Sequence, residues 1–227
     1  MQFPNDASPL CVSCQKKAAT KQYTLKTRSE MLCATCFDRW SVHDAFENEL
    51  RHIFELEGRR QYDEALARLD AILEAERERD HDGWLAGSVA HHRAEILLEA
   101  CRYAEAEQAY DAWARLGFID IWRRRMHALG LARALEGLGR EREAVAVLED
   151  VLGYDDPKDV PFAIRPLAEL ARLSEKLHLP VDSKWLRIAV AVAERYGVDM
   201  PVRDLPGEAI LALEQSIRGK QPKRPDE

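Results

Sequence analysis

Cys11-Val-Ser-Cys14 and Cys33-Ala-Thr-Cys36 are the two motifs that should determine the fold of the N-terminal region, and residues 15–32 lie between them. A gap of two residues lets each pair of thiolates hold one side of a tetrahedral metal ion. We therefore expect Cys11, Cys14, Cys33 and Cys36 to bind one structural Zn²⁺. Two disulfides, free thiols or an iron site are the alternatives. A shell of four thiolates has no open position for water or substrate, which argues against a catalytic metal.

The residues around the cysteines predict a hairpin followed by a helix. Apolar and polar residues alternate from Gln22 to Thr27, whereas the segment from Phe37 to His43 has helical character. A knuckle, a short hairpin and a second Cys-x-x-Cys that opens a helix form a treble clef, in which the helix N-terminus favours thiolates. The spacing and the phrase Met31-Leu-Cys33-Ala-Thr-Cys36 resemble the zinc-binding domain of the ClpX unfoldase. That resemblance covers only residues 11–40, and it implies a protein-docking and dimerising module.

Composition limits the class of protein. The chain has 227 residues, of which 46% are hydrophobic and 32% are charged, so it can bury a sizeable core under a well-solvated surface. It has no apolar run of about 18 residues, and we expect no transmembrane helix. The first residues lack the basic flank and apolar core of a signal peptide. We therefore expect a cytoplasmic protein, in which thiols stay reduced and paired cysteines hold metal.

The charge is distributed unevenly along the chain. Residues 1–40 have a formal charge of +3, while the whole chain has −7, which leaves −10 for the remainder. Four thiolates around one Zn²⁺ add −2, so the loaded metal module carries only about +1. This near-neutral module and the acidic remainder disfavour phosphate binding.

The rest of the sequence predicts helices that repeat. No proline occurs between Pro9 and Pro157, and apolar residues recur at helical spacing. Ala65, Ala106 and Ala144 recur at two similar intervals, and a large apolar residue follows each alanine four positions later. Recurrence of this kind indicates repeated helix hairpins, in which small residues let two helices approach. An irregular helical bundle is the alternative.

The segment Leu131-Ala-Arg-Ala-Leu135-Glu-Gly-Leu138-Gly139-Arg-Glu-Arg-Glu-Ala144 resembles the tetratricopeptide (TPR) repeat family. The resemblance covers roughly residues 42–196 and implies an antiparallel array of helix hairpins. The period is longer than that of the family, and Cys101 replaces the usual glycine of the turn. We expect a fourth hairpin over about 162–178 and 183–196, and a closing helix over Leu205–Ile217.

The predicted organisation has three parts. Residues 1–40 form a four-cysteine treble-clef zinc module with a β-hairpin and a helix, residues 41–218 form a mainly α TPR-like domain, and residues 219–227 form a disordered tail. Within the helical domain we expect Cys101 to be a buried structural thiol. We expect Arg123-Arg124-Arg125 to be a solvated helix surface.

The sequence predicts a protein-binding role. Stacked hairpins form a curved groove lined by the first helix of each pair. The family pattern places eight residues on this face: Ser88, His91, Glu95, Leu98, Met126, Leu129, Arg133 and Glu136. The principal hypothesis is a non-enzymatic adaptor or regulator for another protein or peptide, with homo-oligomerisation left open. No Gly-rich phosphate loop, nucleophile elbow or paired-carboxylate motif indicates an enzyme, although an unrecognised site between repeats is an alternative.

The second hypothesis is nucleic-acid binding through the finger. Its contacts would be Lys16, Lys17, Lys21, Lys26, Arg28 and Tyr23.

Overall fold

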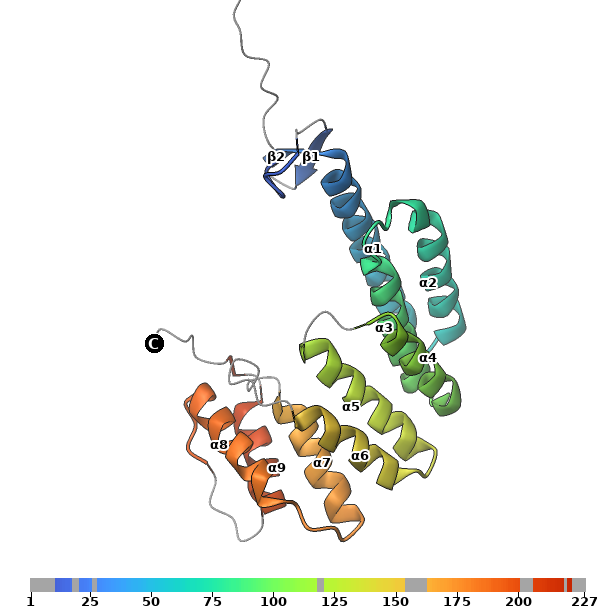
Figure 1. The fold of residues 1–227 in the computed structure, drawn as a ribbon. Helices are drawn as coiled ribbons and strands as arrows, with labels where there is room; N and C mark the ends of the chain where they lie inside the picture. Colours follow the sequence, from blue (N-terminus) through green and yellow to red (C-terminus); the bar gives the residue numbers. More distant parts are fainter. Residues whose placement is uncertain are drawn as a thin grey trace, which may run out of the picture. The chain divides into compact units, whose positions relative to one another are not determined.

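The computed structural model describes residues 11–17, 21–25, 28–117, 121–153, 163–200, 206–218 and 220–221. In this part the protein is mainly helical, with one small antiparallel hairpin near the N-terminus (Figure 1). The chain divides into two compact units, an N-terminal unit Met1–Ile96 and a C-terminal unit Leu97–Glu227. No helix of the described residues is long and apolar enough to cross a membrane.

The N-terminal unit joins the hairpin to the first helices. Its elements are β1 (Lys21–Leu25), β2 (Arg28–Leu32), α1 (Ala34–Gly58), α2 (Tyr62–Glu76), the 3₁₀ turn η1 (Arg77–Arg79) and most of α3 (Trp84–Glu99). The strands pair with Tyr23 opposite Glu30. Val42, Phe46, Leu50 and Ile53 recur at helical spacing on α1 and are buried. The helix runs unbroken across the predicted division between residues 40 and 41, so the metal module and the first hairpin share it.

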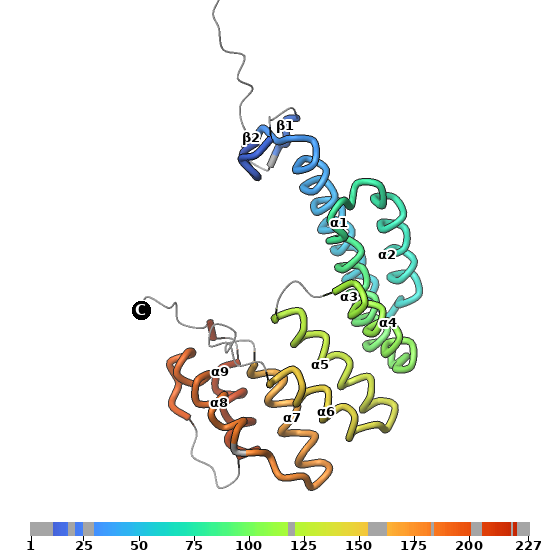
Figure 2. The backbone as a smooth tube through the Cα atoms, in the orientation of Figure 1, coloured from blue at the N-terminus to red at the C-terminus, as the bar shows by residue number. Residues whose placement is uncertain are grey.

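The C-terminal unit is a succession of packed helices (Figure 2). They are α4 (Tyr103–Arg115), α5 (Ile121–Gly137), α6 (Glu141–Leu152), α7 (Ile164–Lys176), α8 (Ser183–Tyr196) and α9 (Pro206–Ile217). Helix α5 packs on α6, α6 on α7, and α7 on α9. Leu135, Leu148, Leu167 and Ile210 belong to one continuous core. The predicted fourth hairpin corresponds to α7 and α8, and the predicted closing helix corresponds to α9.

Four connections between consecutive helices share one type of turn. The first helix of each ends in a Schellman arrangement, in which a residue with positive φ is followed by an N–H that donates to the carbonyl five residues earlier. The residues with positive φ are Arg60 (60°), Cys101 (58°), Gly139 (75°) and His178 (54°). The donors Gln61, Arg102, Arg140 and Leu179 lie 2.8–2.9 Å from the carbonyls of Leu56, Leu97, Leu135 and Ser174. The turn thus recurs along the chain at nearly equal intervals.

The predicted pairs of small and large residues are buried. Ala65, Ala106 and Ala144 each lie near the start of the second helix of a hairpin and have no exposed surface. The large residues four positions later, Leu69, Tyr110 and Leu148, are also fully buried. The alanines therefore permit close packing near each turn, as the sequence pattern predicted.

Two expectations for single residues were wrong. Cys101 is exposed rather than buried, because it occupies the left-handed position of the turn and projects from the connection between α3 and α4. Arg125 is only 2% exposed, because α5 presents this position to the protein interior. The predicted tail, residues 219–227, lies outside the described residues except for Lys220 and Gln221.

Candidate metal centre

The first cysteine pair is held in a tight turn. The N–H of Gln15 donates to the carbonyl of Cys11 (2.8 Å), and the N–H of Cys11 donates to the carbonyl of Lys17 (2.9 Å). The N–H of Val12 donates to the carbonyl of Met31 (3.1 Å), which attaches the turn to β2. These backbone bonds set Cys11 and Cys14 beside the hairpin.

The second pair lies at the start of α1. Cys33 is the N-cap residue, and Cys36 is buried in the first turn. The N–H of Phe37 donates to the carbonyl of Cys33 (2.9 Å). Thiolates at this position are favoured by the partial positive charge of the helix N-terminus.

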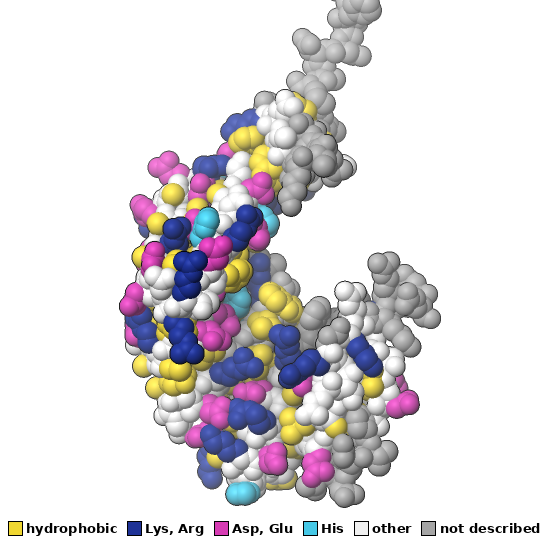
Figure 3. Space-filling view, turned by 180° about the vertical axis from the view of Figure 1, so that it is seen from behind, with side chains coloured by type: hydrophobic (Ala, Val, Ile, Leu, Met, Phe, Trp, Pro, Cys, Tyr) yellow, Lys and Arg dark blue, Asp and Glu magenta, His cyan; other side chains and the backbone are white. Residues whose placement is uncertain are grey.

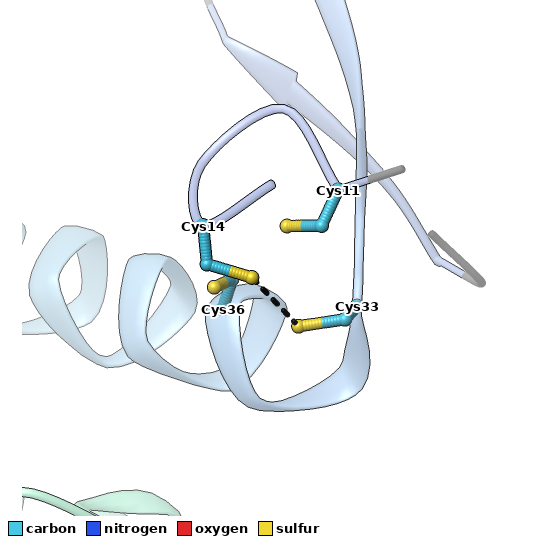
Figure 4. Close-up of side chains that lie close together, drawn as sticks. All are labelled: Cys11, Cys14, Cys33 and Cys36. Carbon is cyan, nitrogen blue, oxygen red and sulfur yellow. Dashed lines mark hydrogen bonds between the residues drawn. The ribbon is translucent and has the colours of Figure 1, made fainter. Parts of the chain in front are cut away.

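The four sulfur atoms converge from the turn, the end of β2 and the helix (Figure 4). All four lie within 4.8 Å of one another, and Cys14 Sγ lies 3.9 Å from Cys33 Sγ. A tetrahedral thiolate site with metal–sulfur bonds of about 2.3 Å needs sulfur–sulfur distances of about 3.8 Å. None of the four forms a disulfide, and three of them are buried. The cluster is compatible with binding one metal ion.

The pKa values of Cys36 and Cys11 are shifted in opposite directions. Burial, together with the neighbouring thiols of Cys33, Cys11 and Cys14, raises the pKa of Cys36 to about 12. Burial also opposes ionisation of Cys11, but backbone hydrogen bonds, the largest at Cys14 and Cys33, bring its pKa down to about 6. A divalent cation would stabilise all four thiolates together, because its charge outweighs the cost of burying them.

Aromatic side chains brace the metal module against α1. Tyr23 is 8% exposed and makes edge-to-face contacts with Phe37 (5.6 Å between ring centroids) and Trp40 (5.5 Å). Its hydroxyl donates to the carbonyl of Trp40 (3.1 Å) and to the carboxylate of Asp44. Burial raises the pKa of Tyr23, and the carboxylate of Asp44 raises it further. Sequence reasoning missed this brace because it depends on the strand and helix meeting in space.

Ion pairs join the start of α1 to the connection between α2 and α3. Asp38 contacts His81 (3.3 Å) and also Lys21 of β1 (3.4 Å). Arg39 pairs with Asp82 at 2.6 Å. The carboxylate of Asp80 accepts from backbone N–H groups at the start of α3 and caps that helix. The metal module and the first hairpin are therefore one connected structure.

Further along α1, histidines and aromatic rings pack together. His92 of α3 lies 5.6 Å from Phe46 and 5.9 Å from Phe54 of α1, and 5.2 Å from His91, between ring centroids. Burial lowers the pKa of His92 to about 4, and the neighbouring His91 adds to the shift. The spacing of Phe46 and Phe54, about two helical turns, is the signal that could have indicated a shared face.

The eight residues predicted for a partner groove lie on two helices. Ser88, His91, Glu95 and Leu98 are on α3, and Met126, Leu129, Arg133 and Glu136 are on α5. Seven of them retain some exposed surface. Leu129 is the exception, because it is only 3% exposed and packs in the interior, so its assignment to an open face was wrong.

Two of the predicted groove residues on α5 form ion pairs with α7. Glu136 pairs with Arg172 and with Lys176 (3.0 Å), and Arg133 lies 3.9 Å from Glu169. These pairs link neighbouring hairpins along one face of the C-terminal unit.

Some of the residues predicted to contact nucleic acid instead make contacts within the four-cysteine module. Tyr23 is buried, and Lys21 lies over the ring of Phe37 (4.8 Å) while it pairs with Asp38. Lys26 lies outside the described residues. On the face that Figure 3 shows, basic side chains are interspersed with acidic ones. This distribution provides no continuous basic stripe for a phosphate backbone among the described residues of that face.

No family model matches the chain, and comparison with curated proteins and with solved structures gives no match.

Proposed function

We propose that this protein is a non-enzymatic adaptor or regulator that binds another protein, with a zinc treble clef and a TPR-like helical array as its docking surfaces. The observation that carries this proposal is the Schellman turn at Arg60, Cys101, Gly139 and His178, which recurs at nearly equal intervals. Repetition of one hairpin creates repeated helix faces, and such faces bind extended segments of other proteins.

Zinc is the metal we propose for the four cysteines. Four thiolates in a knuckle–hairpin–helix arrangement suit its tetrahedral preference, and three of the four are buried. A closed shell of this kind holds shape and performs no chemistry, which supports a docking role. Reduced thiols also fit a cytoplasmic protein.

The TPR-like label rests on the hairpins. In each of the first three hairpins, the second helix begins two residues after the residue with positive φ. That helix buries an alanine in its first turns. The N-cap side chains Gln61, Arg102 and Arg140 each bond a glutamate three residues later, so these helices begin alike. On this assignment α3 and α5 are the first helices of their hairpins, and their exposed faces include Glu95 and Arg133.

Affinity purification followed by mass spectrometry tests the proposal. The wild-type chain, a Cys33→Ser variant and an Arg133→Glu variant are compared after nuclease treatment. Cys101→Ser and Arg115→Glu serve as matched controls, because Cys101 lies outside the metal cluster and Arg115 lies on a second helix. We expect a defined protein partner that the controls retain and that at least one of the test variants loses.

The proposal is contradicted if no protein is retained, or if test variants and controls retain the same set. An electrophoretic mobility shift at low salt addresses the nucleic-acid alternative. We expect no shift at micromolar protein, and a shift that Cys33→Ser abolishes would favour that alternative.

A further inference from the structure

A cleft of about 320 Å³ lies in the C-terminal unit, between the end of α7, the segment that follows it and the first turn of α9. Leu179, Pro180, Val181 and Pro206 contribute apolar walls, and Glu175 and Glu208 also line the cleft. The volume corresponds to about ten water molecules. It can therefore accept one long side chain.

The cleft results from a departure in the fourth hairpin. In the first three hairpins the second helix begins two residues after the left-handed position. After His178 the chain instead runs through Leu179–Asp182 before α8 begins at Ser183. Gly207 places no side chain on the opposite wall of the cleft. A Cβ there would lie 3.3 Å from a methyl group of Val181, which is closer than an ordinary van der Waals contact. The longer connection and this glycine leave the space open.

The two carboxylates at the cleft have no ion-pair partner among the described residues. Neither Glu175 nor Glu208 forms an ion pair within the residues that the structure describes. The adjacent cation Lys176 is directed to Glu136 (3.0 Å) and Glu141 (3.2 Å). Lys184 pairs with Asp182 (3.8 Å) on the other side of the connection. Within the part of the chain that the structure describes, the cleft therefore combines apolar walls with two carboxylates that no ion pair compensates.

The two carboxylates differ in strength as anchors for a cation. Glu175 lies in the last turn of α7, where the helix end has partial negative charge. Glu208 lies in the first turn of α9, where the positive helix end offsets part of its charge. A cation in the cleft should thus depend more on Glu175 than on Glu208.

We propose that this cleft binds an arginine side chain presented by a partner protein. A guanidinium fork donates strongly to a carboxylate, and its apolar stem can lie along the proline and valine walls. His178 adds a flat ring on which a guanidinium can stack. This inference rests on the proposed protein-binding role, because a partner protein must supply the arginine. The cleft itself does not depend on that role.

The test is a titration of the ¹⁵N-labelled full chain, followed by amide chemical shifts. The probe is the capped tripeptide N-acetyl-Ala-Arg-Ala-amide, and its citrulline counterpart has the same shape without the charge. We expect the arginine peptide to shift amides of the cleft residues, with the citrulline peptide at least about tenfold weaker. Glu175→Gln should weaken binding more than Glu208→Gln, and the double variant by at least about tenfold. Glu149→Gln removes a charge from α6, away from the cleft lining, and should leave binding unchanged.

Equal binding of the two peptides would overturn the proposal, as would undiminished binding to the double variant or shifts confined to residues outside the cleft. These results do not depend on any partner from the affinity purification. A failed titration beside a retained partner therefore rejects the arginine cleft alone, and the reverse result rejects the proposed adaptor role alone.

Discussion

Removing the metal should unfold the N-terminal module and leave the helical body folded. Phe37 and Trp40 pack partly buried against the core of the module, whose large, fully buried apolar side chains outside the cysteines are, among the described residues, Tyr23 and Leu32. Each contributes about 2–3 kcal/mol when fully buried, and a two-stranded hairpin is marginal alone. A structural zinc provides on the order of 10 kcal/mol, which exceeds both side chains together. A bound zinc would therefore be the principal source of the module's stability.

The structure also sets where the unfolding should stop. Val42, 2% exposed, and Phe46, 1% exposed, are the first buried residues of α1 that lie beyond the metal module and its core. Before Val42, the contacts of α1 with the α2–α3 connection are the partly exposed pairs Asp38–His81 and Arg39–Asp82, which stabilise little. These residues therefore lose most of their support when the cysteines separate. Protection of backbone amides should consequently be lost from Cys11 to about Ser41 and retained beyond Val42.

Hydrogen–deuterium exchange with mass spectrometry measures this boundary on the wild-type chain before and after chelation, and on Cys36→Ser. Cys101→Ser is the matched control, because its thiol is exposed and lies outside the cluster. Unchanged protection of β1 and β2 after complete metal loss would show that the hairpin does not depend on the metal. Loss of protection throughout α5 to α9 would equally contradict the prediction, since it would mean that the helical body depends on the metal.

Three further predictions concern the helical body. Gly130→Ala should lower the free energy of unfolding in urea by about 1–3 kcal/mol, because a Cβ there overlaps the buried hydroxyl end of Tyr110. Gly87→Ala should raise it by about 0.5–1 kcal/mol, because a Cβ at that position meets open space. Cys101→Gly should raise stability by about 0.5–1 kcal/mol in the same assay, because it relieves a non-glycine residue at φ 58°. His92→Phe should reduce the pH dependence of stability. In the wild type, the neutral imidazole of His92 stabilises the fold fully above its ordinary pKa of 6.5, and this stabilisation is lost as the pH falls to about 4. The loss amounts to about 3 kcal/mol.

Each of these predictions has a clear contrary result. Equal effects of Gly130→Ala and Gly87→Ala would contradict the close packing of α4 against α5. A destabilising Cys101→Gly would show that the turn does not hold this residue in the left-handed region. Parallel stability curves for wild type and His92→Phe between pH 7 and 4 would show that His92 is not buried in its neutral form.

Local patterns in the sequence predicted the features that depend on near neighbours. The spacing of the cysteines predicted the cluster, since a two-residue gap places both thiols on one side of an ion. The recurrence of Ala65, Ala106 and Ala144 predicted hairpin turns, because small residues near a turn are required wherever two helices approach.

Features that depend on which face of a helix is covered were not predictable. Arg125 and Leu129 lie one turn apart on α5, and both are buried although the sequence suggested exposed roles. Cys101 was expected to be buried but is exposed, because the cysteine occupies the left-handed position of the turn, where a glycine is usual. The contact of Tyr23 with Asp44 likewise requires a strand and a helix to meet, which composition alone does not determine.

Native mass spectrometry of the full chain, purified without chelators under reducing conditions, measures directly whether the four cysteines hold zinc. We expect one Zn²⁺ per chain, bound with the loss of the four thiol protons, retained by Cys101→Ser and lost by Cys36→Ser. A metal-free folded chain would contradict a structural zinc site. So would two disulfides, or zinc retained by Cys36→Ser.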